Sequence, residues 1–319
     1  VLAGPNASGK SSVLEGIHTL TQLSGQDPRD VFRGAADVGL IASRGAEGVL
    51  ELQLVGSFRD KRGILSITFG SIEDYPFTAS YLLEAQWGDR HRQIRRELHP
   101  AEGAADQAPI ELPLGSLLRR AALLELDHRR LAEPSFSELP TPLVGPDGAG
   151  LSAVVADMAI ARPDNHQRLV DALRAVFPEI QRVRLVRAKV DKREVAGADL
   201  GPLGGRGVAA SRETVAREAW GHEIVFDLRG APDLPARAVS EGMLLVLGLF
   251  ATLIGPERHR LVLVDHLERA LSPGAIPAFI SQLRRILDLD PKLQIVATSD
   301  SPLLLDQLAP DEVRIHTVL

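Results

Sequence analysis

The chain has 319 residues, of which 45% are hydrophobic and 24% are charged, and its net charge is −6. This composition is typical of a globular protein, and the negative charge argues against a dedicated nucleic-acid-binding domain. The lack of cysteine excludes disulfides, Cys–zinc sites and thiol chemistry. The longest nearly uncharged apolar run, residues 242–255, is too short to cross a bilayer, and no secretory leader is visible. We therefore expect a cytoplasmic protein without a membrane span.

The first motif along the chain has the pattern of a phosphate-binding loop, G-x-x-x-x-G-K-[ST]. It consists of Gly4, Pro5, Asn6, Ala7, Ser8, Gly9, Lys10 and Ser11, and Ser12 follows it. Glycines let successive backbone N–H groups turn inward around phosphates, and the next helix offers its positive N-terminal end. The pattern predicts that Lys10 reaches the β- and γ-phosphates of a nucleotide and that Ser11 binds Mg²⁺. Only three residues precede the motif, so we expect the sequence to begin inside the native protein.

The region after this motif is expected to hold two β-hairpins and then a mostly helical segment. The predicted strands are residues 49–54, 63–69, 81–87 and 92–98, and the predicted helices are residues 116–125, 151–161 and 167–177. Residues 197–207 are rich in glycine and predict a mobile loop. Two basic stretches, residues 89–96 and 182–193, are either solvated faces or contacts to a phosphate backbone.

The last third of the chain alternates buried strands and helices. Residues 222–228 predict a strand, and Ser240 predicts the N-cap of an apolar, buried helix in which Gly242 is the second residue. The apolar run 261–264 predicts a central parallel strand that ends on Asp265, which would be the second ligand of the magnesium. A further buried strand, residues 293–298, precedes Ser299, Asp300, Ser301 and Pro302.

This order of motifs resembles the ABC-type ATPases, and within them the coiled-coil-less bacterial AAA-type proteins of the RecF/SMC/OLD-like group. The resemblance covers nearly the whole chain and includes residues 143–151 and 177–180 of the middle region. It implies an α/β fold: a P-loop NTPase of ABC-head type with a mixed sheet, an antiparallel β-layer and a helical insertion. We expect one domain over residues 1–319, with the P-loop and β-layer in 1–100, the helical lobe in 101–210, and the signature helix, Walker B strand and switch strand in 211–319.

The resemblance also implies a dimer. Ser240 and the backbone of Gly242 would close over the γ-phosphate of an ATP held on the P-loop of a second copy, so that two ATP molecules lie between two chains. The group also uses a glutamine to sense Mg²⁺ and the γ-phosphate, and the candidates are Gln53, Gln86 and Gln93.

Two catalytic positions depart from the group's pattern. The residue after Asp265, normally a glutamate that activates water, is His266, and the switch position, normally histidine, is Asp300. One hypothesis is that His266, oriented by Asp300, serves as the base, since imidazole titrates near neutrality. A second is that hydrolysis is slow or absent, and a third is that Glu268 activates the water.

The resemblance therefore implies a chain that binds ATP and Mg²⁺, dimerises around two ATP and drives a DNA-repair, recombination or phage-defence assembly by hydrolysis. The alternative is a non-hydrolysing ATP sensor that regulates a separate effector, such as a nuclease. A transporter subunit is disfavoured, because the signature lies too far from the P-loop. Nucleic acid is a further possible partner, although the net negative charge of the chain does not indicate it.

Overall fold

The computed structural model describes residues 1–5, 8–23, 50–58, 61–72, 79–87, 90–98, 121–195 and 214–315, and the chain forms two compact units. The first unit comprises residues 1–123, 259–268 and 289–319, and the second comprises residues 124–258 and 269–288. Within the part of the chain that the structure describes, every helix is too short or too polar to cross a membrane.

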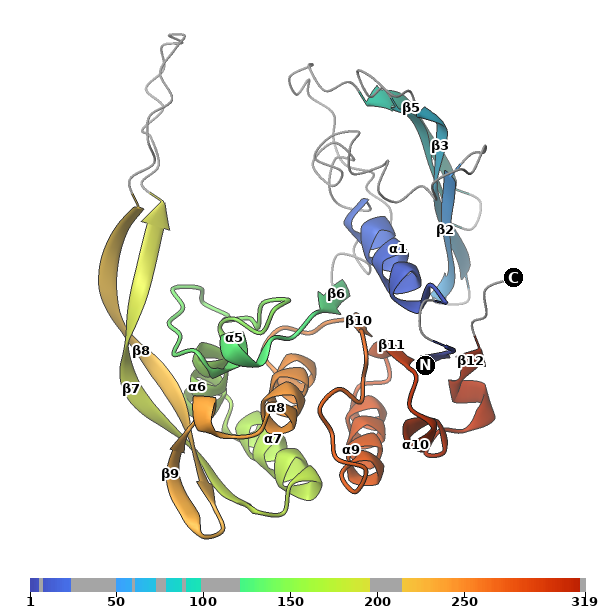
Figure 1. Cartoon of the computed structure of the whole chain (residues 1–319). Helices are drawn as coiled ribbons and strands as arrows, with labels where there is room; N and C mark the ends of the chain where they lie inside the picture. Colours follow the sequence, from blue (N-terminus) through green and yellow to red (C-terminus); the bar gives the residue numbers. More distant parts are fainter. Residues whose placement is uncertain are drawn as a thin grey trace, which may run out of the picture. The chain divides into compact units, whose positions relative to one another are not determined.

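The first unit is built on a five-stranded sheet in the order β12-β1-β11-β10-β6 (Figure 1). Its strands are β12 (Arg314–Ile315), β1 (Leu2–Ala3), β11 (Gln294–Ser299), β10 (Leu261–Val264) and β6 (Ala121–Leu124). The β1, β10, β11 and β12 strands pair in parallel, with Leu2 opposite Thr298 and Val264 opposite Ala297. The residues that follow β1, β10 and β11 therefore meet at one edge of the sheet, where ligands bind in open α/β folds.

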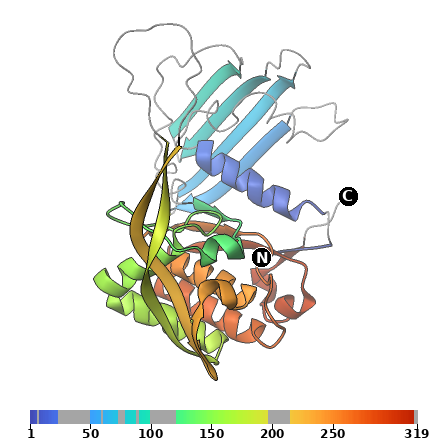
Figure 2. The same ribbon diagram turned by 60° about the vertical axis from the view of Figure 1, so that its left-hand side comes forward.

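A second, antiparallel sheet also belongs to the first unit (Figure 2). Its order is β2-β3-β4-β5, and its strands are β2 (Leu50–Phe58), β3 (Lys61–Ile72), β4 (Ala79–Trp87) and β5 (Arg90–Leu98). Helix α1 (Lys10–Leu23) follows the P-loop and lies against β2 and β3. The unit also contains α10 (Pro302–Leu305) and η2 (Pro310–Glu312).

The second unit combines helices with a long two-stranded ribbon (Figures 1 and 2). Its helices are α5 (His128–Ala132), α6 (Leu151–Ala161), α7 (Pro163–Val176), α8 (Glu241–Ile254) and α9 (Ile276–Leu289), with η1 (Ala236–Ala238) before α8. The ribbon pairs β7 (Ile180–Val195) with β8 (Thr214–Leu228), and β9 (Ala231–Pro235) pairs with β8 at the end of the ribbon that lies near the helices.

Helix α8 is the centre of this unit because almost all its side chains are apolar. Phe250 is fully buried and stacks on Phe279 of α9, with ring centroids 5.9 Å apart. Gly248 lets α5 approach α8, since a Cβ there would lie 2.5 Å from a methyl carbon of Leu131. Because most side chains of α8 are buried, a helix with almost no polar face is stable in this position.

The structure confirms most of the expected elements and corrects two. The structure contains both hairpins, the helices expected at 151–161 and 167–177, and the buried helix α8. It also contains the two buried strands expected near the end of the chain, β10 and β11. The helix expected at 116–125 is wrong for residues 121–124, which form β6 beside β10, and residues 116–120 lie outside the described residues. The segment expected to be helical also contains β7, a strand of 16 residues. The loop expected at 197–207 lies outside the described residues.

Candidate functional site

The P-loop connects β1 to α1, as the pattern predicts. Gly4 and Pro5 follow β1, Ser8 N donates to Pro5 O at 3.3 Å, and Gly9 has a φ of +89°, which favours glycine. Asn6 and Ala7, predicted to belong to the same loop, lie outside the described residues.

Lys10 holds its ammonium group inside the loop rather than in solvent. Its residue is only 5% exposed, and Nζ donates to Gly4 O at 2.9 Å and to Pro5 O at 2.8 Å. Ser8 Oγ is buried and has no hydrogen-bond partner among the described residues. A buried cation and an unsatisfied hydroxyl in one loop fit the phosphates of a nucleotide, which accept hydrogen bonds from both.

Ser11 and Asp265, far apart in the sequence, face each other at the edge of the sheet. Ser11 Oγ donates to Asp265 Oδ1 at 3.1 Å and Oδ2 at 3.0 Å. A hydroxyl and a carboxylate are hard oxygen donors of the kind that Mg²⁺ prefers. The two residues predicted as magnesium ligands are therefore brought together, and their chemistry fits that ion. Ser12 is exposed on the first turn of α1.

Thr298 is a residue of this edge that the sequence analysis missed. It is fully buried near the end of β11, where its hydroxyl donates to Asp265 Oδ1 and accepts from His266 N at 2.8 Å. Its carbonyl oxygen accepts from Leu267 N at 3.0 Å. A polar residue at the end of an apolar strand was the signal that could have found it.

His266 leaves β10 in a left-handed conformation, with a φ of +51°, which is uncommon for residues other than glycine. Its side chain is 47% exposed, and Nε2 lies 4.0 Å from Asp265 Oδ2. The backbone hydrogen bond to Thr298 stabilises this turn, so the imidazole is held beside the predicted magnesium ligand.

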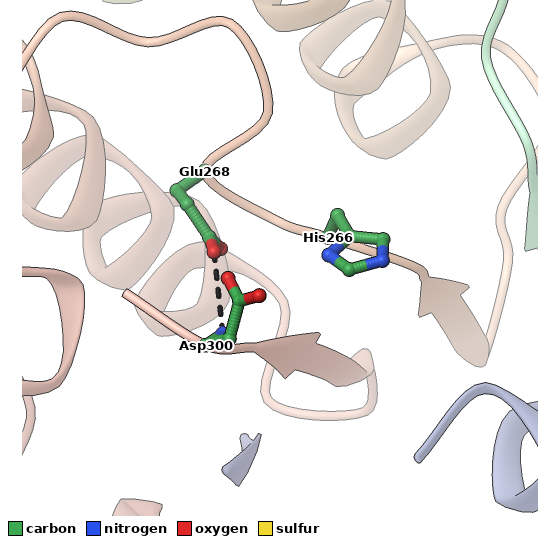
Figure 3. Close-up of side chains that lie close together, drawn as sticks. All are labelled: His266, Glu268 and Asp300. Carbon is green, nitrogen blue, oxygen red and sulfur yellow. Dashed lines mark hydrogen bonds between the residues drawn. The ribbon is translucent and has the colours of Figure 1, made fainter. Parts of the chain in front are cut away.

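Glu268 and Asp300 lie near His266, as Figure 3 shows. Asp300 N donates to Glu268 Oε1 at 3.3 Å, whereas Glu268 Oε2 is buried and has no hydrogen-bond partner among the described residues. One donor atom from each of the three side chains lies within 4.8 Å of the others. The structure therefore brings together the three residues considered for water activation: His266 and Asp300, which depart from the group's pattern, and Glu268.

Ser240 and Gly242 belong to the second unit and begin α8. Ser240 is its N-cap, and its Oγ accepts from Met243 N at 3.3 Å. Glu241 pairs with Arg269 at 3.0 Å, and Gly242 lies against the backbone of Ala270. This helix start is therefore fixed from two sides by the segment that follows Glu268.

Two basic residues of β7 bind acidic partners on the neighbouring strands. Arg184 binds Asp227 through two hydrogen bonds and also pairs with Asp233, and Lys189 pairs with Glu218 at 2.7 Å. Hydrogen bonds to both aspartates raise the pKa of Arg184. At these two positions the positive charge is therefore balanced by acidic partners. Residues 90–96 of the other basic stretch lie in β5, and Gln53, Gln86 and Gln93 lie in β2, β4 and β5, but none of these side chains is described.

Two solved structures are similar to the chain. The chain is similar to the SMC head domain from Thermotoga maritima, with 10% identity, a TM-score of 0.37, and coverage of 98% of this chain and 84% of that one. It is also similar to the Smc head domain with an extended coiled coil bound to the C-terminal domain of ScpA from Pyrococcus furiosus, with 12% identity, a TM-score of 0.43, and coverage of 96% and 84%. With TM-scores below 0.5, these similarities add nothing to the assignment. Among curated proteins there is no match.

The assignment instead comes from a family model that matches residues 1–306. Its description is "AAA domain, putative AbiEii toxin, Type IV TA system". The match runs from the P-loop through β10 and β11 to α10, and so includes every motif that carried the resemblance to AAA-type ABC ATPases. The chain belongs to this AAA domain family and has the fold of a P-loop NTPase.

Proposed function

We propose that the chain binds ATP with Mg²⁺ at the P-loop and hydrolyses it, and that this cycle works as a switch. The observation that carries the proposal is the direct pairing of Ser11 Oγ with both oxygens of Asp265, beside the buried ammonium of Lys10. Lys10 and Ser11 begin α1, whereas Asp265 follows β10, and their meeting at one edge of the sheet matches the needs of a nucleotide–magnesium complex.

The roles of the loop residues follow from their positions. The backbone of residues 4–12 would surround the phosphates, and Lys10 would exchange its two carbonyl acceptors for phosphate oxygens. Ser11 and Asp265 would hold the magnesium. When bound, Mg·ATP supplies a phosphoanhydride bond whose cleavage releases free energy.

Water activation is assigned to His266, with Asp300 as the group that orients the imidazole. The 4.0 Å distance between His266 Nε2 and Asp265 Oδ2 supports this role, since the imidazole would lie beside the proposed magnesium ligand. Glu268 is the competing base, because its Oε2 is unpaired among the described residues.

The dimer forms when Ser240 and Gly242 of one copy close over the γ-phosphate held by another. The N-terminus of α8 supports this role, since a helix start with a serine cap favours an anion. We propose that the dimer drives a DNA-repair, recombination or phage-defence assembly, and the toxin named in the family description is consistent with defence.

A second candidate function is a sensor that binds ATP without turnover and regulates a separate effector, such as a nuclease. The specific observation that favours it is that His266, and no carboxylate, directly follows Asp265.

Phosphate release from Mg·ATP by the purified chain tests the proposal. Lys10→Ala is the inactive control, and Lys292→Ala, at an exposed lysine, is the matched control. Turnover by the wild type and Lys292→Ala, with none by Lys10→Ala, supports an ATPase. ATP binding and dimer formation without turnover supports the sensor, and the absence of ATP binding contradicts both.

A further inference from the structure

We propose that His266, Glu268 and Asp300 form a binding site for a first-row divalent cation, with Zn²⁺ as its representative. The three residues supply one imidazole nitrogen and two carboxylates, and one donor atom from each lies within 4.8 Å of the others. Figure 3 shows the carboxyl groups of Glu268 and Asp300 close together and the imidazole alongside. This inference needs neither ATP binding nor hydrolysis, so it can be tested apart from the proposed function. It concerns the same three side chains, and while the cation is bound the His266 nitrogen that ligates it cannot serve as the base.

The backbone around the three donors is held in place by hydrogen bonds between the ends of β10 and β11. His266 N and Leu267 N both bind Thr298, through its hydroxyl and its carbonyl oxygen, at 2.8 and 3.0 Å. Asp300 N donates to Glu268 Oε1 at 3.3 Å. The backbone that carries the donors is therefore fixed before any cation arrives, which reduces the entropy cost of binding.

The charges of this cluster are uncompensated by the described residues around it. Two carboxylates lie near each other, and their like charges repel. Glu268 Oε2 is buried without a hydrogen-bond partner among the described residues, an arrangement that costs free energy. A divalent cation would remove the repulsion and give the buried oxygen a partner.

The donor types distinguish this cluster from the magnesium site beside it. Ser11 and Asp265 offer only oxygen, whereas an imidazole with two carboxylates favours Zn²⁺ and its neighbours in the first row over Mg²⁺. A tetrahedral ion with bonds of about 2.1 Å needs donors about 3.4 Å apart. His266 and Asp300 are exposed, so small rotations of their side chains can close the remaining gap and leave a fourth position for water.

Zn²⁺ titration of the full chain without nucleotide, after treatment with a chelator, tests the proposal. We expect one equivalent to bind, and we expect His266→Ala, Glu268→Gln and Asp300→Asn each to weaken the affinity at least about tenfold. Co²⁺ in place of Zn²⁺ should give a visible absorption band, which the three substitutions should remove.

Two further variants separate this site from its surroundings. Asp306→Asn changes an exposed carboxylate of the same segment and should bind Zn²⁺ like the wild type. Ser11→Ala should also bind Zn²⁺ like the wild type. A loss of Zn²⁺ binding in this variant would show that the cation binds at the proposed magnesium ligands instead. Glu268→Gln keeps the shape of the side chain, so a loss in that variant with an unchanged circular dichroism spectrum supports a ligand role. Binding of less than one equivalent by the wild type, or unchanged affinity in the three variants, overturns the proposal.

Discussion

Gly242, at the start of α8, lies so close to Ala270 that a Cβ on the glycine would be 2.4 Å from the Ala270 carbonyl oxygen. Ala270 itself has a φ of +59°, and the neighbouring Arg269 binds Glu241. The start of α8 and the segment after Glu268 are therefore packed backbone to backbone. Any side chain at position 242 has to push them apart.

Gly242→Ala is expected to destabilise the fold by about 1–3 kcal/mol, since the clash is with backbone and outweighs the higher helix propensity of alanine. The free energy of unfolding in urea measures the effect. Gly274→Ala is the matched control, because a Cβ there meets nothing within 4 Å. Equal stability of the two variants would contradict the close packing.

Ser11→Ala is expected to remove most of the magnesium dependence of ATP binding, because the variant lacks one of the two proposed ligands. We expect the affinity for ATP in Mg²⁺ to fall about tenfold or more, with a smaller change in excess chelator. Titration with a fluorescent ATP analogue measures both values. Ser281→Ala, at an exposed serine of α9, should behave like the wild type. A full magnesium effect in Ser11→Ala would argue against Ser11 as a ligand.

His266→Ala is expected to lower ATP turnover by about 10²–10⁴-fold, the usual contribution of a general base, and to leave ATP affinity unchanged. Steady-state phosphate release and equilibrium binding give the two quantities. His128→Ala, at the first residue of α5, is the control. If turnover survives in His266→Ala and is lost in Glu268→Gln, the base is Glu268.

Asp227 is expected to make the stability of the second unit depend on pH. The hydrogen bonds from Arg184, followed by the one from Asp233 N, lower the pKa of Asp227. Because its folded pKa lies below its unfolded pKa, its contribution is complete above about pH 5 and is lost as the pH falls through the lowered value. Thermal unfolding between pH 7 and pH 3 should show this loss, and Asp227→Asn should show less of it. Asp288→Asn, an exposed carboxylate, serves for comparison.

The sequence was sufficient for the features whose pattern is local. Glycine spacing predicted the P-loop, and apolar runs predicted β10, β11 and the buried α8. The helix expected at 116–125 failed at residues 121–124 because the high helix propensities of alanine and leucine amount to little free energy per residue, and pairing with β10 outweighs them. Thr298 escaped notice because its importance depends on contacts with residues 32 and 33 positions away.

The backbone passes between the two units after residues 123, 258, 268 and 288. No single cut therefore yields two intact folding pieces, and fragments made by truncation would each lack part of a core. Limited proteolysis should accordingly yield nicked chains that stay associated rather than stable separate halves. One of these crossings between the units lies directly after Glu268. A split or circularly permuted protein opened at this point would interrupt the chain between Asp265 and the segment that packs on Gly242.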